Sequence, residues 1–149
     1  LVHLMELTIG VSEFRNTGNA ATLLKQIPDE YPKLKEALQK FDWKTQINEY
    51  TGIVNSLLEL LKRVREPESD DSKFSDICEM IWTSFHQQFR QIHFNENLLK
   101  TDLNTRPCDM AEIQYFIGKW YYEQQRYGVA LATALETFTV TAFPNCLYA

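Results

Sequence analysis

The sequence predicts an all-α protein, a bundle of about seven helices that ends in two helices joined by a tight turn. Only 5 Gly and 5 Pro interrupt the 149 residues, and both residue types are unfavourable inside helices. Apolar residues recur at three- and four-residue spacing through most of the chain, which is the period of one helix face. Alternating apolar and polar residues form no convincing strand pattern. We therefore expect one helical domain over residues 1–149, with N-terminal helices in 1–65 and C-terminal helices in 72–142.

The first helix is predicted over residues 2–15. One face of this segment carries Leu4, Leu7, Val11 and Phe14. Gly10 weakens the helical pattern, so a strand start is the alternative here. Asn19 is a suitable cap for a short second helix over residues 20–26, which Pro28 ends.

Pro32 is well placed in the first turn of a third helix. The buried positions of that helix are Leu34, Ala37, Leu38 and Phe41. A longer fourth helix is predicted from Lys44 to about Val64. Its stripe comprises Ile47, Tyr50, Val54, Leu57, Leu58 and Leu61. The acidic connection over residues 66–72 is interpreted as a plain solvated surface loop.

The strongest helical period of the chain lies between residues 72 and 94. Its apolar positions are Phe74, Ile77, Cys78, Ile81, Trp82, Phe85, Phe89 and Ile92. We expect one long helix here, followed by a connection over residues 95–108.

Residues 109–140 are predicted to form the two closing helices. Asp109 with Glu112 is an Asp version of a capping box. The stripe of the first of these helices holds Ile113, Phe116, Ile117, Trp120 and Tyr121. The break falls in residues 123–128. The second helix repeats Ala130, Ala134 and Phe138, with Leu131 and Leu135 beside them. Small residues on that face predict a close helix pair with Trp120 buried at the seam.

Composition and charge narrow the classes of function. The formal charge of -5 argues against a chain that binds nucleic acid or anionic lipid through its net charge, and we expect neither DNA nor a membrane as a partner. The cysteines Cys78, Cys108 and Cys146 lack metal-type spacing, which fits free thiols in a reducing cytosol. No run is long and apolar enough to span a bilayer. The sequence therefore predicts a cytoplasmic protein.

Arg90 and His93 lie three residues apart and would share one face of the long helix. An Arg and a His together can neutralise a phosphate and move a proton, as a metal-independent ribonuclease requires. The commoner interpretation is a surface pair beside the buried stripe. The role of Arg90 and His93 stays open, and neither His86 nor His3 adds a catalytic pattern.

No residue is predicted to be catalytic, cofactor-binding or metal-binding. The acidic residues between 66 and 76 lack a glycine-centred calcium loop and a His pair. The glycines lack the spacing of a phosphate-binding loop, and no serine lies in a nucleophile elbow. We expect no cofactor.

The aromatic residues of the two closing helices have two interpretations. The run comprises Tyr115, Phe116, Trp120, Tyr121, Tyr122 and Tyr127. Such side chains can stack nucleic-acid bases, but aromatic residues at helical spacing more often belong to a core.

The same segment partly follows the tetratricopeptide pattern. The matching positions are Gly118, Tyr121, Tyr127 and Ala130. Gln114 stands at the usual Trp position, and no second copy follows. We therefore expect a single tetratricopeptide-like αα-hairpin, and a helical repeat-like protein-interaction module unrelated to CRISPR is the alternative function.

Two segments resemble CRISPR-associated proteins that pair a CARF sensor with a HEPN domain. Residues 117–136, IGKWYYEQQRYGVALATALE, are similar to a helix with an aromatic-aromatic-Glu patch, a turn and an Ala-Leu helix holding Glu. Residues 11–20, VSEFRNTGNA, are similar to the passage from the sensor into the helical half. The order and spacing of the two segments agree with that family.

The resemblance implies a cytosolic antiviral-defence protein that senses cyclic oligoadenylate and cleaves RNA through a HEPN dimer. No Rossmann-like strand set precedes the helices in this sequence, and the family's catalytic Arg and His normally lie beyond the hairpin. Arg90 and His93 have a different spacing and position. No ligand-sensing or catalytic residue is therefore carried over.

We expect this chain to be the helical region of a type III CRISPR-associated protein and a fragment of a longer protein. In this interpretation it is a scaffold or dimerisation part without catalysis of its own. Whether the complete protein is an enzyme stays open, because a HEPN ribonuclease is implied by the resemblance alone. The expected partner is a second copy or another protein, whereas RNA and cyclic oligoadenylate follow only from the resemblance.

Overall fold

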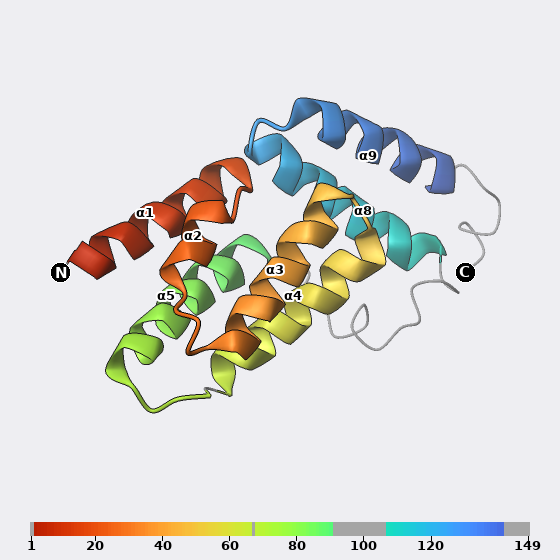
Figure 1. Ribbon diagram of the computed structural model, residues 1–149. Helices are drawn as coiled ribbons and strands as arrows, with labels where there is room; N and C mark the ends of the chain where they lie inside the picture. The colour runs from red at the N-terminus through yellow and green to blue at the C-terminus, as the bar shows by residue number, and fades with distance from the viewer. Residues whose placement is uncertain (1, 67, 91–106, 142–149) are drawn as a thin grey trace. The chain divides into compact units, whose positions relative to one another are not determined.

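A computed structural model of the chain describes residues 2–66, 68–90 and 107–141. Within these ranges the protein is all-α, with seven helices and no strand, which confirms the predicted fold class (Figure 1). The chain forms two compact units, Leu1–Phe89 and Arg90–Ala149. None of the helices in the described part is both long and apolar enough to cross a bilayer.

The first unit contains five helices. They are α1 (Val2–Thr17), α2 (Ala21–Gln26), α3 (Pro32–Gln46), α4 (Tyr50–Arg65) and α5 (Ser72–Gln88). The strand alternative for the first segment is wrong, because α1 is continuous through Gly10. Asn19 does act at the start of α2, where its Oδ1 accepts a hydrogen bond of 2.9 Å from the backbone N–H of Ala21.

Gly10 allows α1 and α2 to pack closely. A Cβ atom at this position would lie 2.9 Å from both the backbone N and the Cα of Leu23 on α2. Gly18 then ends α1 with a φ of 71°, and its N–H donates to the carbonyl oxygen of Phe14 over 2.8 Å. The glycine that weakens the helical pattern in the sequence is therefore the one that the α1–α2 contact requires.

We expect Gly10→Ala to lower the free energy of unfolding by about 1–3 kcal/mol, because the new methyl group meets backbone atoms that cannot rotate away. This loss exceeds the gain of about 0.5–1 kcal/mol that Ala normally brings inside a helix. Gly128→Ala is the matched control, since a Cβ there has no neighbour within 4 Å. Urea denaturation of both variants tests the prediction, and equal stability of the two would contradict it.

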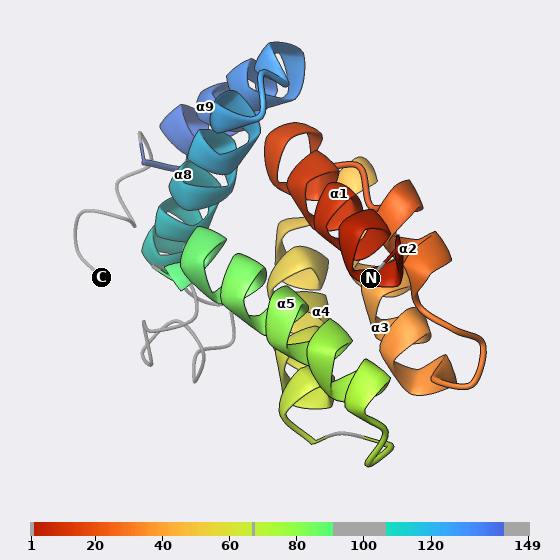
Figure 2. The same ribbon diagram turned by 90° about the vertical axis from the view of Figure 1, so that its left-hand side faces the viewer.

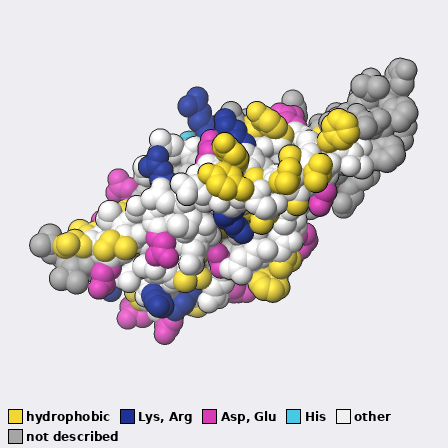
Figure 3. Space-filling model, turned by 90° about the horizontal axis from the view of Figure 1, so that it is seen from above, with side chains coloured by type: hydrophobic (Ala, Val, Ile, Leu, Met, Phe, Trp, Pro, Cys, Tyr) yellow, Lys and Arg dark blue, Asp and Glu magenta, His cyan; other side chains and the backbone are white. Residues whose placement is uncertain are grey.

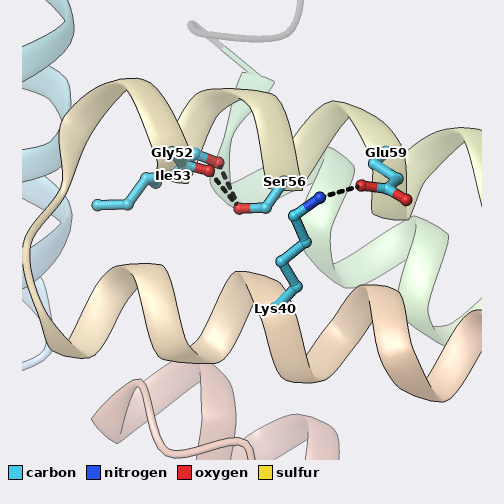
Figure 4. Close-up of polar contacts among 5 residues, drawn as sticks. All are labelled: Lys40, Gly52, Ile53, Ser56 and Glu59. Carbon is cyan, nitrogen blue, oxygen red and sulfur yellow. Dashed lines mark hydrogen bonds and ion pairs between the residues drawn. The ribbon is translucent and has the colours of Figure 1, made fainter.

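Helices α3 and α4 lie side by side (Figures 1 and 2). Buried residues of α3 include the predicted Leu34, Ala37, Leu38 and Phe41. The Nζ of Lys40 on α3 lies 2.9 Å from the Oε2 of Glu59 on α4, and Figure 4 shows this ion pair between the two helices. Both side chains of this pair are more than one-third exposed, so the apolar contacts, rather than the ion pair, hold the two helices together.

The predicted boundary between these two helices is wrong. Lys44 belongs to the last turn of α3, and Ile47 is 46% exposed in the connection rather than buried in the stripe of α4. The chain turns at Asn48, whose φ is 53°, and the N–H of Glu49 donates to the carbonyl oxygen of Lys44 over 3.2 Å. Asn tolerates this left-handed conformation better than most residues, so it can end a helix without Gly or Pro.

Four phenylalanines form the centre of the first unit. The rings of Phe14 and Phe85 are stacked, with centroids 4.6 Å apart and planes at 7°. Phe41 meets Phe85 edge-on at 5.6 Å and Phe89 at 5.5 Å. All four side chains are at most 2% exposed. This cluster joins α1, α3 and α5, as the predicted stripes of those helices require.

The acidic connection between α4 and α5 contacts two helices through its side chains and is more than a plain solvated loop. Glu68 Oε1 accepts a hydrogen bond of 3.1 Å from the N–H of Leu34, in the first turn of α3. Asp71 caps α5 by accepting from the N–H of Lys73 over 3.1 Å. Its second oxygen accepts from the hydroxyl of Tyr31 over 2.8 Å. The connection therefore supplies hydrogen-bond acceptors for the N-termini of two helices.

We expect the stabilisation by Asp71 to depend on pH. The hydroxyl of Tyr31 and, after it, the N–H of Lys73 lower the pKa of this carboxyl. Because the folded-state pKa lies below the unfolded one, the stabilisation is present above the unfolded value of about 3.9 and is lost as the pH falls through the folded value. Asp71→Asn should therefore destabilise the protein at pH 7 and much less near pH 3.

Urea denaturation at both pH values measures this difference. Asp70→Asn is the control, because it removes the same charge one residue earlier from an exposed position. A loss of stability for Asp71→Asn that is equal at the two pH values would contradict the prediction.

The second unit contains α8 (Pro107–Glu123) and α9 (Tyr127–Thr141) among its described residues. The predicted capping box required Asp109 to lie just before the helix. This prediction is wrong, because α8 begins at Pro107 and Asp109 lies inside its first turn. The break between the helices lies at Gln125, whose φ is 60°, and the N–H of Arg126 donates to the carbonyl oxygen of Tyr121 over 3.0 Å. Gly128, by contrast, is already part of α9.

Candidate protein-binding groove

Helix α8 buries the predicted stripe with one exception. Ile113, Ile117 and Tyr121 are fully buried and Trp120 is 5% exposed. Phe116 is only half-buried. The prediction that Trp120 is largely buried is thus confirmed.

Helix α9 turns a different face to α8 from the one expected. Thr133 is fully buried and Ala130 is 8% exposed. A Cβ atom at Gly118 on α8 would lie 3.2 Å from Cγ2 of Thr133 and 3.9 Å from the carbonyl oxygen of Ala130. Ala134 and Phe138, which were expected at this seam, are exposed. The prediction was wrong because α9 has apolar residues on most of its faces, so spacing alone does not identify the buried one.

Because α9 does not turn its more apolar face to α8, a set of large apolar side chains is exposed on the second unit. Yellow side chains gather on the surface seen in Figure 3. Each member of the set is between 57% and 72% exposed. The set comprises Tyr115, Tyr122, Tyr127, Leu131, Leu135 and Phe138. Together these six side chains expose on the order of 600 Å² of apolar surface.

Most of these side chains border one apolar groove between α8 and α9, with a volume of about 770 Å³. Gly118 lines the groove on the α8 side and Ala134 on the α9 side. Tyr122 and Tyr127 stand at one end, with ring centroids 5.4 Å apart, and Phe138 lies toward the other end of α9. We call this feature the α8–α9 groove.

Two polar side chains of the α8–α9 groove stand out from its apolar lining. Lys119 is the one charged residue among its described lining residues, and no carboxylate of the described chain lies within salt-bridge distance of it. Gln114 is 4% exposed, and its Oε1 finds no hydrogen-bond partner among the described residues. Buried acceptors are normally paired, so the amide oxygen of Gln114 is an exception, whereas the ammonium group of Lys119 is exposed to solvent.

The predicted ribonuclease pair is only partly placed by the structure. Arg90 is exposed just beyond α5, while His93 lies outside the described residues. His86 is half-buried on α5, with its ring 4.7 Å from that of Trp82. The guanidinium of Arg65 covers the same indole at 4.1 Å. His86 and Arg65 therefore pack against the same indole of Trp82.

Cys78 is a buried free thiol. Burial, with a smaller contribution from the negative charge of Glu68, raises its pKa to about 11. The thiolate is the reactive form of cysteine, so this residue has an environment that suits packing and not nucleophilic chemistry. The side chains of Cys108 and Cys146 lie outside the described part of the structure.

The acidic side chains do not gather around a cation position. Within residues 2–66, 68–90 and 107–141, no three His, Cys, Asp or Glu side chains come together as a metal site. Glu68 and Asp71 are instead bound to the N-termini of α3 and α5.

Sequence reasoning missed the α8–α9 groove, although one pattern in the sequence could have identified it. Tyr127, Leu131, Ala134 and Phe138 follow one another at intervals of four, three and four residues, which is the spacing of a helix–helix seam. That stripe and the Ala130–Thr133 stripe compete for the same neighbour. Which one faces α8 depends on the close approach at Gly118.

Comparison with known families gives one match, which covers the first unit from residue 3 and continues to residue 102. A family model described as CRISPR-associated protein MJ1674, second domain, matches residues 3–102. This range includes residues 11–20, one of the two segments that carried the resemblance, but not residues 117–136. No curated protein and no solved structure matches the chain.

Proposed function

The chain belongs to the family of the second domain of CRISPR-associated protein MJ1674, and from this we propose that it is a cytoplasmic scaffold of CRISPR-based antiviral defence. In this proposal it works through contacts with protein surfaces and has no catalysis of its own. The α8–α9 groove is the observation that supports it most, because a large uncovered apolar surface is typical of protein-binding sites. The contact is either dimerisation with a second copy or binding of another protein.

The surroundings of the candidate reactive groups support a role without catalysis. A nucleophile needs a base within hydrogen-bond reach, or a lowered pKa. Cys78 has a raised pKa, and the ring of His86 packs against Trp82. Arg90 is exposed, and His93 lies outside the described residues.

The finer part of the proposal is that the complete protein is of the CARF–HEPN kind. Its support is the resemblance of residues 11–20, which lie within the matched range. The second segment, residues 117–136, lies outside that range and supports the proposal by its resemblance alone. Family membership also favours a CRISPR-associated scaffold over the alternative of an unrelated repeat-type interaction module.

Two measurements on the purified chain test the absence of catalysis and sensing. Fluorescent single-stranded RNA should stay intact on incubation with it, and calorimetry should detect no binding of cyclic tetra- or hexa-adenylate. RNA cleavage that co-purifies with the chain through gel filtration would contradict the scaffold proposal.

We expect the double substitution Leu131→Asp with Phe138→Asp to change the free energy of unfolding by less than about 1 kcal/mol. Both side chains are more than 60% exposed, so a carboxylate in either place stays solvated. Met5→Asp on α1, at 61% exposure, is the matched control outside the groove. Chemical denaturation makes the measurement. A loss above about 2 kcal/mol for the groove variant alone would mean that the chain itself covers this surface.

A further inference from the structure

We propose that the α8–α9 groove binds one amphipathic helix of a partner protein, which brings an apolar stripe to α9 and a carboxylate to Lys119. This inference rests on the proposed function and identifies the kind of partner that the scaffold would hold. Three features of the groove carry it: the spacing of its apolar residues, the shape of its lining and its unmatched charge.

The spacing of the exposed stripe on α9 fits a helix better than an extended peptide. Tyr127, Leu131, Ala134 and Phe138 are separated by four, three and four residues, as the inner positions of paired helices are. They span about 16 Å along α9, because a helix rises 1.5 Å per residue. A partner helix of about three turns would cover that length.

The lining of the groove leaves room for the backbone of such a helix. Ala134 lines it with a small side chain, while Tyr115, Tyr122 and Phe138 border it with large ones. Small residues let two helices approach closely, and large residues beside them fix the position of the incoming helix. An incoming helix would contact α8 and α9 together, as a third helix of a bundle does.

The charge of the groove identifies the polar group of the partner. Lys119 is exposed and unpaired among the described residues, and covering its ammonium group with an apolar partner would remove water without replacing it. A carboxylate on the partner avoids that penalty. A groove-to-groove contact between two copies does not place one there, because the described lining of the groove contains Lys119 and no acidic residue.

The test uses the full chain and fluorescent helical peptides of fourteen residues, with Leu at intervals of four, three and four. Four of the peptides carry a single Glu, each at a different position beside the Leu stripe. Four matched peptides carry Lys at the same positions. Fluorescence anisotropy should show at least one Glu peptide binding ten-fold or more tightly than its Lys counterpart. Lys119→Glu should reverse this preference, and Ala134→Arg should abolish binding of every peptide.

Equal binding of the Glu and Lys peptides would overturn the inference, as would the absence of binding to all eight. Light scattering of the same samples gives the oligomeric state. A dimer of the wild-type chain that Ala134→Arg separates into monomers would assign the groove to a second copy instead. None of these results affects the RNA and cyclic-oligoadenylate measurements, so the failure of this inference and the failure of the scaffold proposal are distinguishable.

Discussion

Phe85→Ala should lower the free energy of unfolding by about 3–5 kcal/mol, a large part of the roughly 5–15 kcal/mol that holds an ordinary domain together. Phe85 is fully buried and stacks on Phe14 at a centroid distance of 4.6 Å. It also meets the edge of Phe41 at 5.6 Å. Its removal leaves a cavity where α1, α3 and α5 meet, and the rings around that cavity cannot all move to fill it.

Chemical denaturation followed by far-ultraviolet circular dichroism measures this loss. The matched control is Phe138→Ala, which makes the same chemical change at a position that is 72% exposed. The control should change the free energy of unfolding by less than about 0.5 kcal/mol. If Phe85→Ala and Phe138→Ala had similar effects, the phenylalanine cluster would not be the centre of the first unit.

Trp120→Ala should have an effect of similar size, about 3–5 kcal/mol. The indole is 5% exposed and lies 5.3 Å from the ring of Tyr121, measured between centroids. A side chain of this size excludes roughly 150–250 Å² from water when it is buried. The expected loss follows from burial alone and does not depend on which face of α9 contacts α8.

Tyr122→Ala is the control for this prediction, because Tyr122 is 64% exposed only two residues further along the same helix. Denaturation of the two variants separates a core role from a base-stacking role for Trp120. A loss below about 1 kcal/mol for Trp120→Ala would place the indole on the surface and would favour contact with nucleic acid.

The turns show where the local sequence was informative and where it was not. Pro32 at the start of α3 and Gly18 at the end of α1 are residues whose backbone preferences indicate a boundary by themselves. The chain also turns at Asn48 and Gln125, which have positive φ values. Gln rarely adopts this conformation, so the predicted break over residues 123–128 contains the turn, but the sequence does not identify Gln125 as its centre.

The acidic connection shows how a tertiary contact changes the interpretation of a segment. A short run of acidic residues is normally solvated, and nothing in residues 66–72 indicates which helix it approaches. The hydrogen bond from Leu34 to Glu68 joins residues 34 positions apart in the chain. Only the fold brings this carboxylate to the N-terminus of α3.

The sequence by itself determined the all-α class and most of the buried stripes of α3, α5 and α8, because each of these three helices has one apolar face and one polar face. The stripe predicted for α1 was only partly right, since Leu7 and Phe14 are fully buried whereas Leu4 is 41% exposed. Only the tertiary structure decided which face of α9 is buried. Ala130 and Thr133 face α8 since Gly118 allows a close approach there, and the more apolar stripe with Leu131 and Phe138 is left exposed. Periodicity reports that a face is apolar, whereas the shape of the neighbouring helix determines whether that face is covered.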